Sequence, residues 1–258
     1  YVLSAFLARP VWGDVATAFV MPTFRPETAY LFTIMALIGT TITPFMQVYV
    51  QSTVVEKGLD KDDLPIARAD VVFGTTFAVV IAAFIVISTA ATLHLQGIYE
   101  VDSAATAAQA LVPVVGEYAK YLFAIGLFGA AMLAMGVLPL ATAYSMSEAL
   151  GFEKGLSRTF REAPIFLGLF TILIVVGTVV ALIPGIPQIK LLIFTQSVNG
   201  LLLPVILVAI VKLASNTEIM GEHANGKYFN FFAWTITAIV SLLSLMLIGY
   251  SIADTFTG

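Results

Sequence analysis

Charged residues are so sparse in this sequence that they divide it into long uncharged segments. Six segments contain no Asp, Glu, Lys or Arg, and each is at least 21 residues long. They are residues 28–55, 71–99, 121–147, 163–189, 191–211 and 228–253. A helix needs about 20 apolar residues to cross the hydrocarbon core, whereas a membrane-spanning strand alternates over about 10 residues. The pattern therefore predicts six membrane-spanning α-helices.

A seventh apolar stretch, at residues 1–8, is predicted to be the end of another span. It reads YVLSAFLA, with no initiator Met and no preceding basic segment, so it is not typical of a signal peptide. We therefore expect residues 1–258 to form a single transmembrane domain that lacks its N-terminal helices.

The composition excludes an ordinary soluble protein. Of the 258 residues, 59% are hydrophobic and 11% are charged, whereas a soluble domain has roughly 45–50% apolar and about 25% charged residues. A soluble fold of this size cannot bury so much apolar surface and still form a polar exterior. The net charge of −4 does not favour a nucleic-acid partner, and the absence of Cys excludes disulfides and thiolate ligands. The sequence predicts a multi-pass integral protein of the lipid bilayer, most simply the plasma membrane.

The distribution of basic residues predicts how the spans are oriented. Loops 57–70, 151–162 and 212–227 contain eight Lys and Arg residues, and the connections on the other side contain four. The positive-inside rule therefore places these three loops in the cytoplasm and the acidic 95–118 connection outside. Within that connection, residues 101–116 are expected to form a short surface helix.

Polar residues interrupt the first apolar segment at its middle, in the sequence GTTITPFMQVYVQS (residues 39–52). Pro44 lacks an N–H group and clashes with the preceding helical turn, so a break is expected there. The polar residues around it are Thr40, Thr41, Thr43, Gln47 and Gln51. Two interpretations remain open. Threonine hydroxyls could satisfy a simple proline kink, or an unwound stretch could expose carbonyls that bind a cation.

A second interruption, TQSVNGLLLP, covers residues 195–204 of the fifth segment. Gln196 and Asn199 are three residues apart and so share a helix face. Amides in hydrocarbon need hydrogen-bond partners, since an unsatisfied polar group costs several kcal/mol. They could form hydrogen bonds between helices, or they could line a polar site.

The sequence contains no recognisable catalytic motif. It has no Ser/His/Asp arrangement, no Gly-rich phosphate loop and no H-E-x-x-H, and no charged residue lies within the six apolar segments. His94 lies near the outer end of its segment and is expected to be an interfacial residue rather than a ligand. The sequence predicts neither an enzyme nor a resident cofactor.

The proline-broken helix ending in Y-x-Q-S (residues 49–52) resembles the sixth transmembrane helix of the NRAMP divalent-metal transporters. Residues 8–24 are similar to the family's connection between helices five and six, and residues 193–221 to its tenth helix and the following loop. This resemblance covers essentially the whole chain, from the end of helix five through helix eleven. It implies the second half of a LeuT-type fold, in which two inverted repeats surround a midplane site and helices one and six are unwound.

Two departures from the family pattern bear on the transported ion. The family's A-x-x-M-P-H sequence has its metal-binding Met at the position of Thr43 and its His at the position of Phe45. A thioether favours transition metals, whereas oxygen ligands suit hard cations such as Mg²⁺. The pattern resembles the NRAMP-related magnesium transporters, which implies transport of Mg²⁺, and also Mn²⁺, without proton coupling.

The resemblance also implies a set of ligands. Thr43 and Thr40 would line the site from helix six, Gln196 would approach the ion from helix ten, and Asn199 is a secondary candidate. The family's D-P-G-N motif of helix one does not occur in these 258 residues, so the preceding helices are the expected source of the site's carboxylate. Residues 1–258 alone are therefore not expected to transport metal.

Three other functions remain open on the sequence. A proton-coupled Mn²⁺ or Fe²⁺ transporter would keep the family and change the cargo, although the residues at positions 43 and 45 argue against it. A Na⁺-coupled amino-acid carrier could share the fold. A membrane scaffold without transport is disfavoured because intramembrane polar residues are costly to retain.

Overall fold

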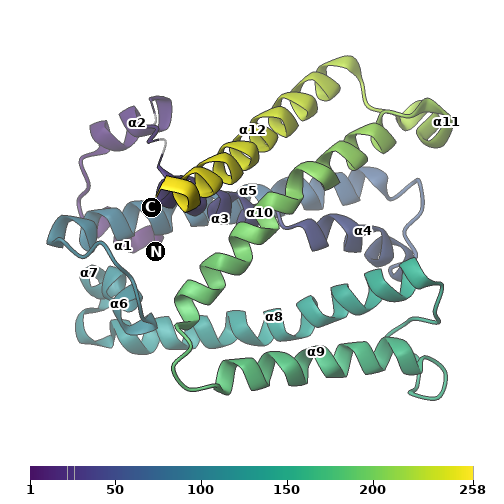
Figure 1. Ribbon diagram of the computed structural model, residues 1–258, viewed down its shortest axis with the longest axis horizontal. Coiled ribbons are helices and arrows are strands. Elements are labelled where there is room, and N and C mark those ends of the chain that lie inside the picture. The colour runs from purple at the N-terminus through teal and green to yellow at the C-terminus, as the bar shows by residue number, and fades with distance from the viewer. Residues whose placement is uncertain (22, 26, 258) are drawn as a thin grey trace. The chain divides into compact units, whose positions relative to one another are not determined.

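The structure is a computed structural model that describes residues 1–21, 23–25 and 27–257 (Figure 1). The described residues form helices and connections, with no strand among them. The α-helices are α1 (Val2–Leu7), α2 (Trp12–Val20), α3 (Thr28–Thr41), α4 (Pro44–Glu56), α5 (Leu64–Thr92), α6 (Ala104–Ala108), α7 (Val112–Val115), α8 (Ala119–Leu150), α9 (Pro164–Leu182), α10 (Gln188–Ala214), α11 (Thr217–Met220) and α12 (Lys227–Thr257). Short 3₁₀ turns are η1 (His94–Gln96), η2 (Gln109–Leu111), η3 (Gly116–Tyr118) and η4 (Gly221–His223).

Six helical segments of the described residues are long and apolar enough to cross a membrane. They are Thr28–Glu56, Leu64–Gln96, Ala104–Leu150, Pro164–Leu182, Gln188–Ala214 and Lys227–Ala253. Each overlaps one of the six uncharged segments of the sequence. The prediction of an all-α, multi-pass integral membrane protein with six spans is confirmed.

The helix ends differ from the limits of the uncharged segments. Helix α5 begins seven residues before its segment, with Pro65 in its first turn, where the missing N–H costs nothing. Helix α8 includes Lys120 and Glu148 near its two ends, where charged side chains can extend toward the membrane surface. The expected surface helix at 101–116 is divided into α6, η2 and α7, because Pro113 lies in the first turn of a new helix and Gly116, with a φ of 54°, ends it.

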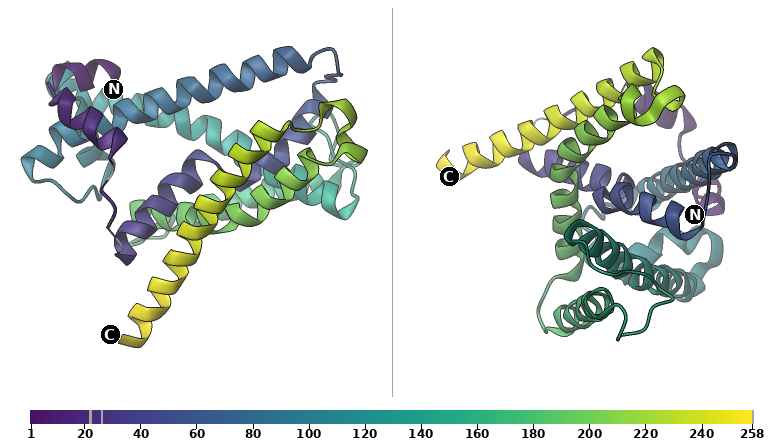
Figure 2. Two further views of the ribbon diagram at one scale, coloured as in Figure 1. Left: turned by 90° about the horizontal axis from the view of Figure 1, so that it is seen from above. Right: turned by 90° about the vertical axis from the view of Figure 1, so that its right-hand side faces the viewer.

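The chain divides into two compact units, of which the first contains Tyr1–Thr23 and Tyr49–Ile189. Within it, α8 and α9 lie side by side along their lengths in Figure 1, and the right-hand view of Figure 2 shows the same two helices nearly end-on. Their contact is a cluster of buried residues in which the rings of Tyr144 and Phe166 meet edge to face, with centroids 4.7 Å apart. This pair forms the apolar centre of the first unit.

A buried pair of serines joins three segments of the same unit. The Ser4 hydroxyl of α1 donates to the carbonyl of Ala110 in η2. The Ser88 hydroxyl of α5 lies 2.8 Å from the Ser4 oxygen and 3.1 Å from the same carbonyl, so its single proton is shared between these two acceptors. Both serines are fully buried. Because a buried hydroxyl is costly without a partner, these bonds fix α1 and α5 at the Ala110 turn.

The second unit contains Phe24–Val48 and Lys190–Gly258. Helix α12 packs along α3, and their contact is centred on Leu31, Met35 and Leu247, which are all buried. Helix α10 crosses α3 in the same unit. The boundary between the two units falls inside α4, which therefore belongs to both.

Candidate functional site

The first predicted interruption is a break in the helix. Helix α3 ends at Thr41, and Ile42 has a φ of −119° and a ψ of 80°, which lies outside the helical region. Pro44 then starts α4. Because proline has no N–H group, it cannot donate to the carbonyl of Thr40 four residues earlier. The break predicted near Pro44 is confirmed, and it is located at residues 42–43, immediately before the proline.

Helices α3 and α10 cross at two glycines. A Cβ atom on Gly39 would overlap the carbonyl oxygen of Gln196 and lie 2.5 Å from the nitrogen of Gly200. A Cβ atom on Gly200 would overlap the carbonyl oxygen of Met35. The two backbones are therefore in direct contact, as small residues permit in membrane helices. This contact brings the polar segment of α10 next to the last turn of α3.

Two of the predicted site residues lie in one groove as a result. The groove has a volume of about 330 Å³ between α3 and α10, and its polar side chains are Thr33, Thr40 and Gln196. Thr40 is exposed and Gln196 is half-buried. The structure thus gathers a hydroxyl and an amide beside the C-terminal end of α3, where the helix dipole favours a cation.

The other predicted residues have different positions. Asn199 donates from Nδ2 to Oε1 of Gln196 over 3.1 Å, which agrees with their predicted common face. The Gln196 oxygen has two lone pairs, so it can accept this bond and still coordinate a cation. Thr43 and Phe45 are half-buried at the break, and neither they nor Asn199 belong to the lining of the groove.

The sequence reasoning missed the role of Ser197. Its hydroxyl is buried and lies 3.1 Å from the carbonyl of Phe32 in α3 and 3.1 Å from that of Ile193 in its own helix. Ser197 therefore provides the hydrogen bond between helices that was considered for Gln196 and Asn199. One feature of the sequence pointed to this role, because Ser197 lies between Gln196 and Asn199 in the same polar segment.

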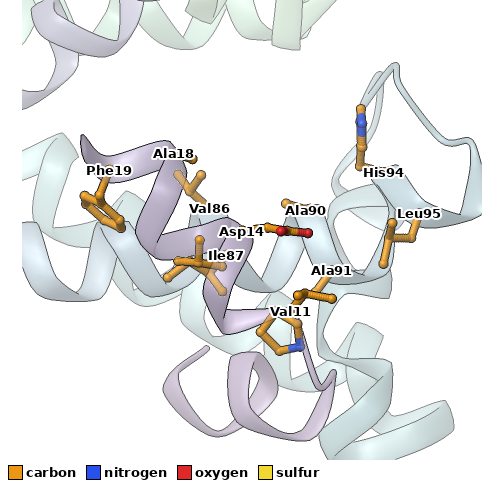
Figure 3. A pocket seen from close by; sticks show the side chains of 12 residues that line it. Val11, Asp14, Ala18, Phe19, Val86, Ile87, Ala90, Ala91, His94 and Leu95 are labelled. Atoms are coloured by element: carbon orange, nitrogen blue, oxygen red, sulfur yellow. The ribbon is translucent and has the colours of Figure 1, made fainter. Parts of the chain in front are cut away.

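A larger groove of about 410 Å³ lies between α2 and α5 in the first unit (Figure 3). Its lining is apolar apart from Asp14 and His94, whose side chains extend from different helices without meeting (Figure 3). The exposed His94 ring packs edge-on against Tyr99, with centroids 4.8 Å apart. Among the described residues, no three His, Asp or Glu side chains form a cluster that could hold a metal ion.

These features define a class of protein: a multi-pass helical membrane protein with a broken helix and neutral polar groups gathered beside the break. Residues 1–249 match the sequence pattern of the Nramp family, described as natural resistance-associated macrophage protein-like. The chain belongs to this family. Its members are transporters rather than enzymes, as the lack of catalytic motifs predicts.

Relatives of known name cover nearly the whole chain. The divalent metal cation transporter MntH of Clostridium acetobutylicum is 26% identical over 267 residues, which include 100% of this chain and 57% of the relative. MntH of Ralstonia nicotianae is 26% identical and MntH 1 of Pseudomonas aeruginosa 27% identical, each over 96% of this chain and 57% of the relative. The chain thus spans a little over half the length of these relatives.

Proposed function

We propose that this chain is part of a secondary transporter that carries divalent cations across the membrane by alternating access. The main support is the position of Thr40 and Gln196, which lie in one groove beside a helix break in a protein of the Nramp family. Broken helices in transporters present backbone carbonyls and helix ends to the transported ion. The names of the curated relatives also support divalent metal cations as the cargo.

We further propose that the cargo is Mg²⁺, with Mn²⁺ also accepted, and that transport is not coupled to protons. The candidate ligands Thr40, Thr43, Gln196 and Asn199 provide neutral oxygens, which suit a hard and partly hydrated cation. Phe45 provides no titratable group at the position where the resemblance places a histidine. In this proposal the site lies in a LeuT-type fold, and the part of the relatives that this chain does not cover supplies the carboxylate.

A proton-coupled carrier of Mn²⁺ or Fe²⁺ is the second candidate. It is supported by the match of residues 1–249 to the family as a whole, whereas Thr43 and Phe45 support the magnesium proposal. The cargo and the coupling can be tested in a single experiment.

Uptake by the full-length protein in proteoliposomes should separate the two candidates. With Mg²⁺, Mn²⁺ and Ca²⁺ supplied in turn and internal pH recorded, we expect Mg²⁺ uptake without acidification. Uptake of Mn²⁺ alone, accompanied by acidification, would support the second candidate instead. Inhibition by amino acids but not by divalent ions would contradict both.

Replacing Gln196 by leucine should weaken divalent-cation binding by about tenfold or more, because the charge–dipole contact of one amide oxygen is worth roughly 1.5–3 kcal/mol. Isothermal titration of Mg²⁺ or Mn²⁺ into the purified full-length protein measures the loss of affinity. The matched control is Thr195→Val, since the Thr195 hydroxyl is exposed and bonds to the carbonyl of Leu192 within its own helix. Equal affinities in both variants would remove Gln196 from the site.

A further inference from the structure

The last turns of α4 present a row of side chains to α8 in the first unit. Tyr49, Ser52 and Glu56 follow one another at spacings of three and four residues, so they share a helix face. The Ser52 hydroxyl donates to Oε2 of Glu148 over 2.7 Å, and the Tyr144 hydroxyl donates to Oε1 of Glu56 over 2.6 Å. Each helix therefore gives one hydroxyl to a carboxylate of the other.

The loop after α8 completes this arrangement. Nζ of Lys154 lies 2.7 Å from Oε1 of Glu148, and the backbone N–H of Leu156 donates to the Tyr144 hydroxyl over 3.2 Å. Glu148 thus has a separate donor for each oxygen. Five side chains hold α4 against α8 and the loop that follows α8. We call this group the α4 clasp, and its members are Ser52, Glu56, Tyr144, Glu148 and Lys154.

The burial of these residues indicates that the clasp can open. Ser52 is only 3% exposed, but the side chains of Glu148 and Lys154 are 32% and 31% exposed. An ion pair so accessible to water adds little stability by itself and exchanges readily with solvent. The buried Ser52 hydroxyl, in contrast, needs its carboxylate partner while α4 stays on α8. Loss of the ion pair leaves the Glu148 carboxylate free to turn toward water, and the buried Ser52 hydroxyl then loses its partner.

We propose that the α4 clasp is a releasable latch on the helix that begins at the break. Helix α4 starts at Pro44 and carries the clasp in its final turns, so its attachment to α8 limits how far it can move. Its loop, residues 151–162, is one of those that the charge distribution predicts to be cytoplasmic. Opening the clasp frees this end of α4 and regulates the return of the transporter to its other conformation; this consequence rests on the proposed function.

A single thiol at Ser52 can report on the latch, because the chain contains no Cys. In the full-length protein carrying Ser52→Cys, alkylation by a maleimide should be slow, since the site is buried. Adding Lys154→Ala should accelerate it by about fivefold or more, as expected for a local opening made more frequent. Lys154→Arg, which keeps both the cation and the Glu148 carboxylate, should keep alkylation slow. The neighbouring exposed carboxylate gives the matched control, Glu153→Gln, which should leave the rate unchanged.

Binding and transport measurements then separate the latch from the proposed function. With Ser52 retained, Lys154→Ala should keep the divalent-cation Kd within about twofold and change the transport turnover by threefold or more, because Lys154 is not a candidate ligand and the clasp limits the rate at which α4 moves. Equal alkylation rates with and without Lys154 would overturn the latch. If the parent protein binds no divalent cation, the proposed function fails, and the alkylation rates still decide whether the clasp opens.

Discussion

Replacing Gly200 by alanine is expected to lower the free energy of unfolding by about 3 kcal/mol, at the upper end of the usual cost of overpacking. The added methyl group would overlap the carbonyl oxygen of Met35, and the Met35 side-chain methyl lies only 3.0 Å from the same point. Neither α3 nor α10 can yield locally, because the obstructing atoms include backbone. The helices must separate, which also moves Gln196 away from Thr40.

The midpoint of thermal aggregation in detergent, followed by fluorescence-detected size exclusion, measures this loss. A decrease of roughly 6–12 °C corresponds to it for a domain of this size. Gly177→Ala in α9 is the matched control, since a Cβ atom there meets nothing within 4 Å. Alanine is the better helix former, so the control should be neutral or slightly stabilising. Similar losses in both variants would show that the crossing of α3 and α10 is not in tight contact.

Replacing Thr43 by methionine is expected to change the selectivity of the proposed transporter. A thioether at the break would favour Mn²⁺ over Mg²⁺, and we expect the ratio of their transport rates to rise by about tenfold, equivalent to about 1.4 kcal/mol. Competition between the two ions in proteoliposome uptake gives this ratio directly. The change leaves the groove lined by Thr40 and Gln196 intact, because Thr43 does not line it.

Thr43→Leu separates the effect of sulfur from that of size. Leucine has a similar volume to methionine but no ligand atom, so it should reduce uptake of both ions without favouring Mn²⁺. If the leucine and methionine variants change the ratio equally, the thioether is not responsible and position 43 does not contact the ion.

The features that the sequence predicted well are those with a local chemical cause. The break at residues 42–43 follows from the missing N–H of Pro44, and the shared face of Gln196 and Asn199 follows from their spacing. The six spans follow from the length of the uncharged segments. Each of these inferences needs only neighbouring residues and the known dimensions of a helix and a bilayer.

The features that the sequence did not predict depend on which distant segments meet. The chain contains 19 glycines, and nothing in the local pattern marks Gly39 and Gly200 as a contact between helices. Ser52 and Glu148 are 96 residues apart, and both lie near the ends of uncharged segments, where side chains can also reach water. Their pairing depends on the packing of α4 against α8, which local periodicity does not determine.

The two buried serines of the first unit have a consequence for biosynthesis. Ser4 and Ser88 are separated by 84 residues, which a ribosome needs roughly 4–17 s to add at its usual rate. During that interval the newly made α1 lacks both the Ser88 hydroxyl and the Ala110 carbonyl. Until α5 and the Ala110 turn have been synthesised, the Ser4 hydroxyl therefore depends on another acceptor, such as a carbonyl of its own helix, water or a lipid headgroup.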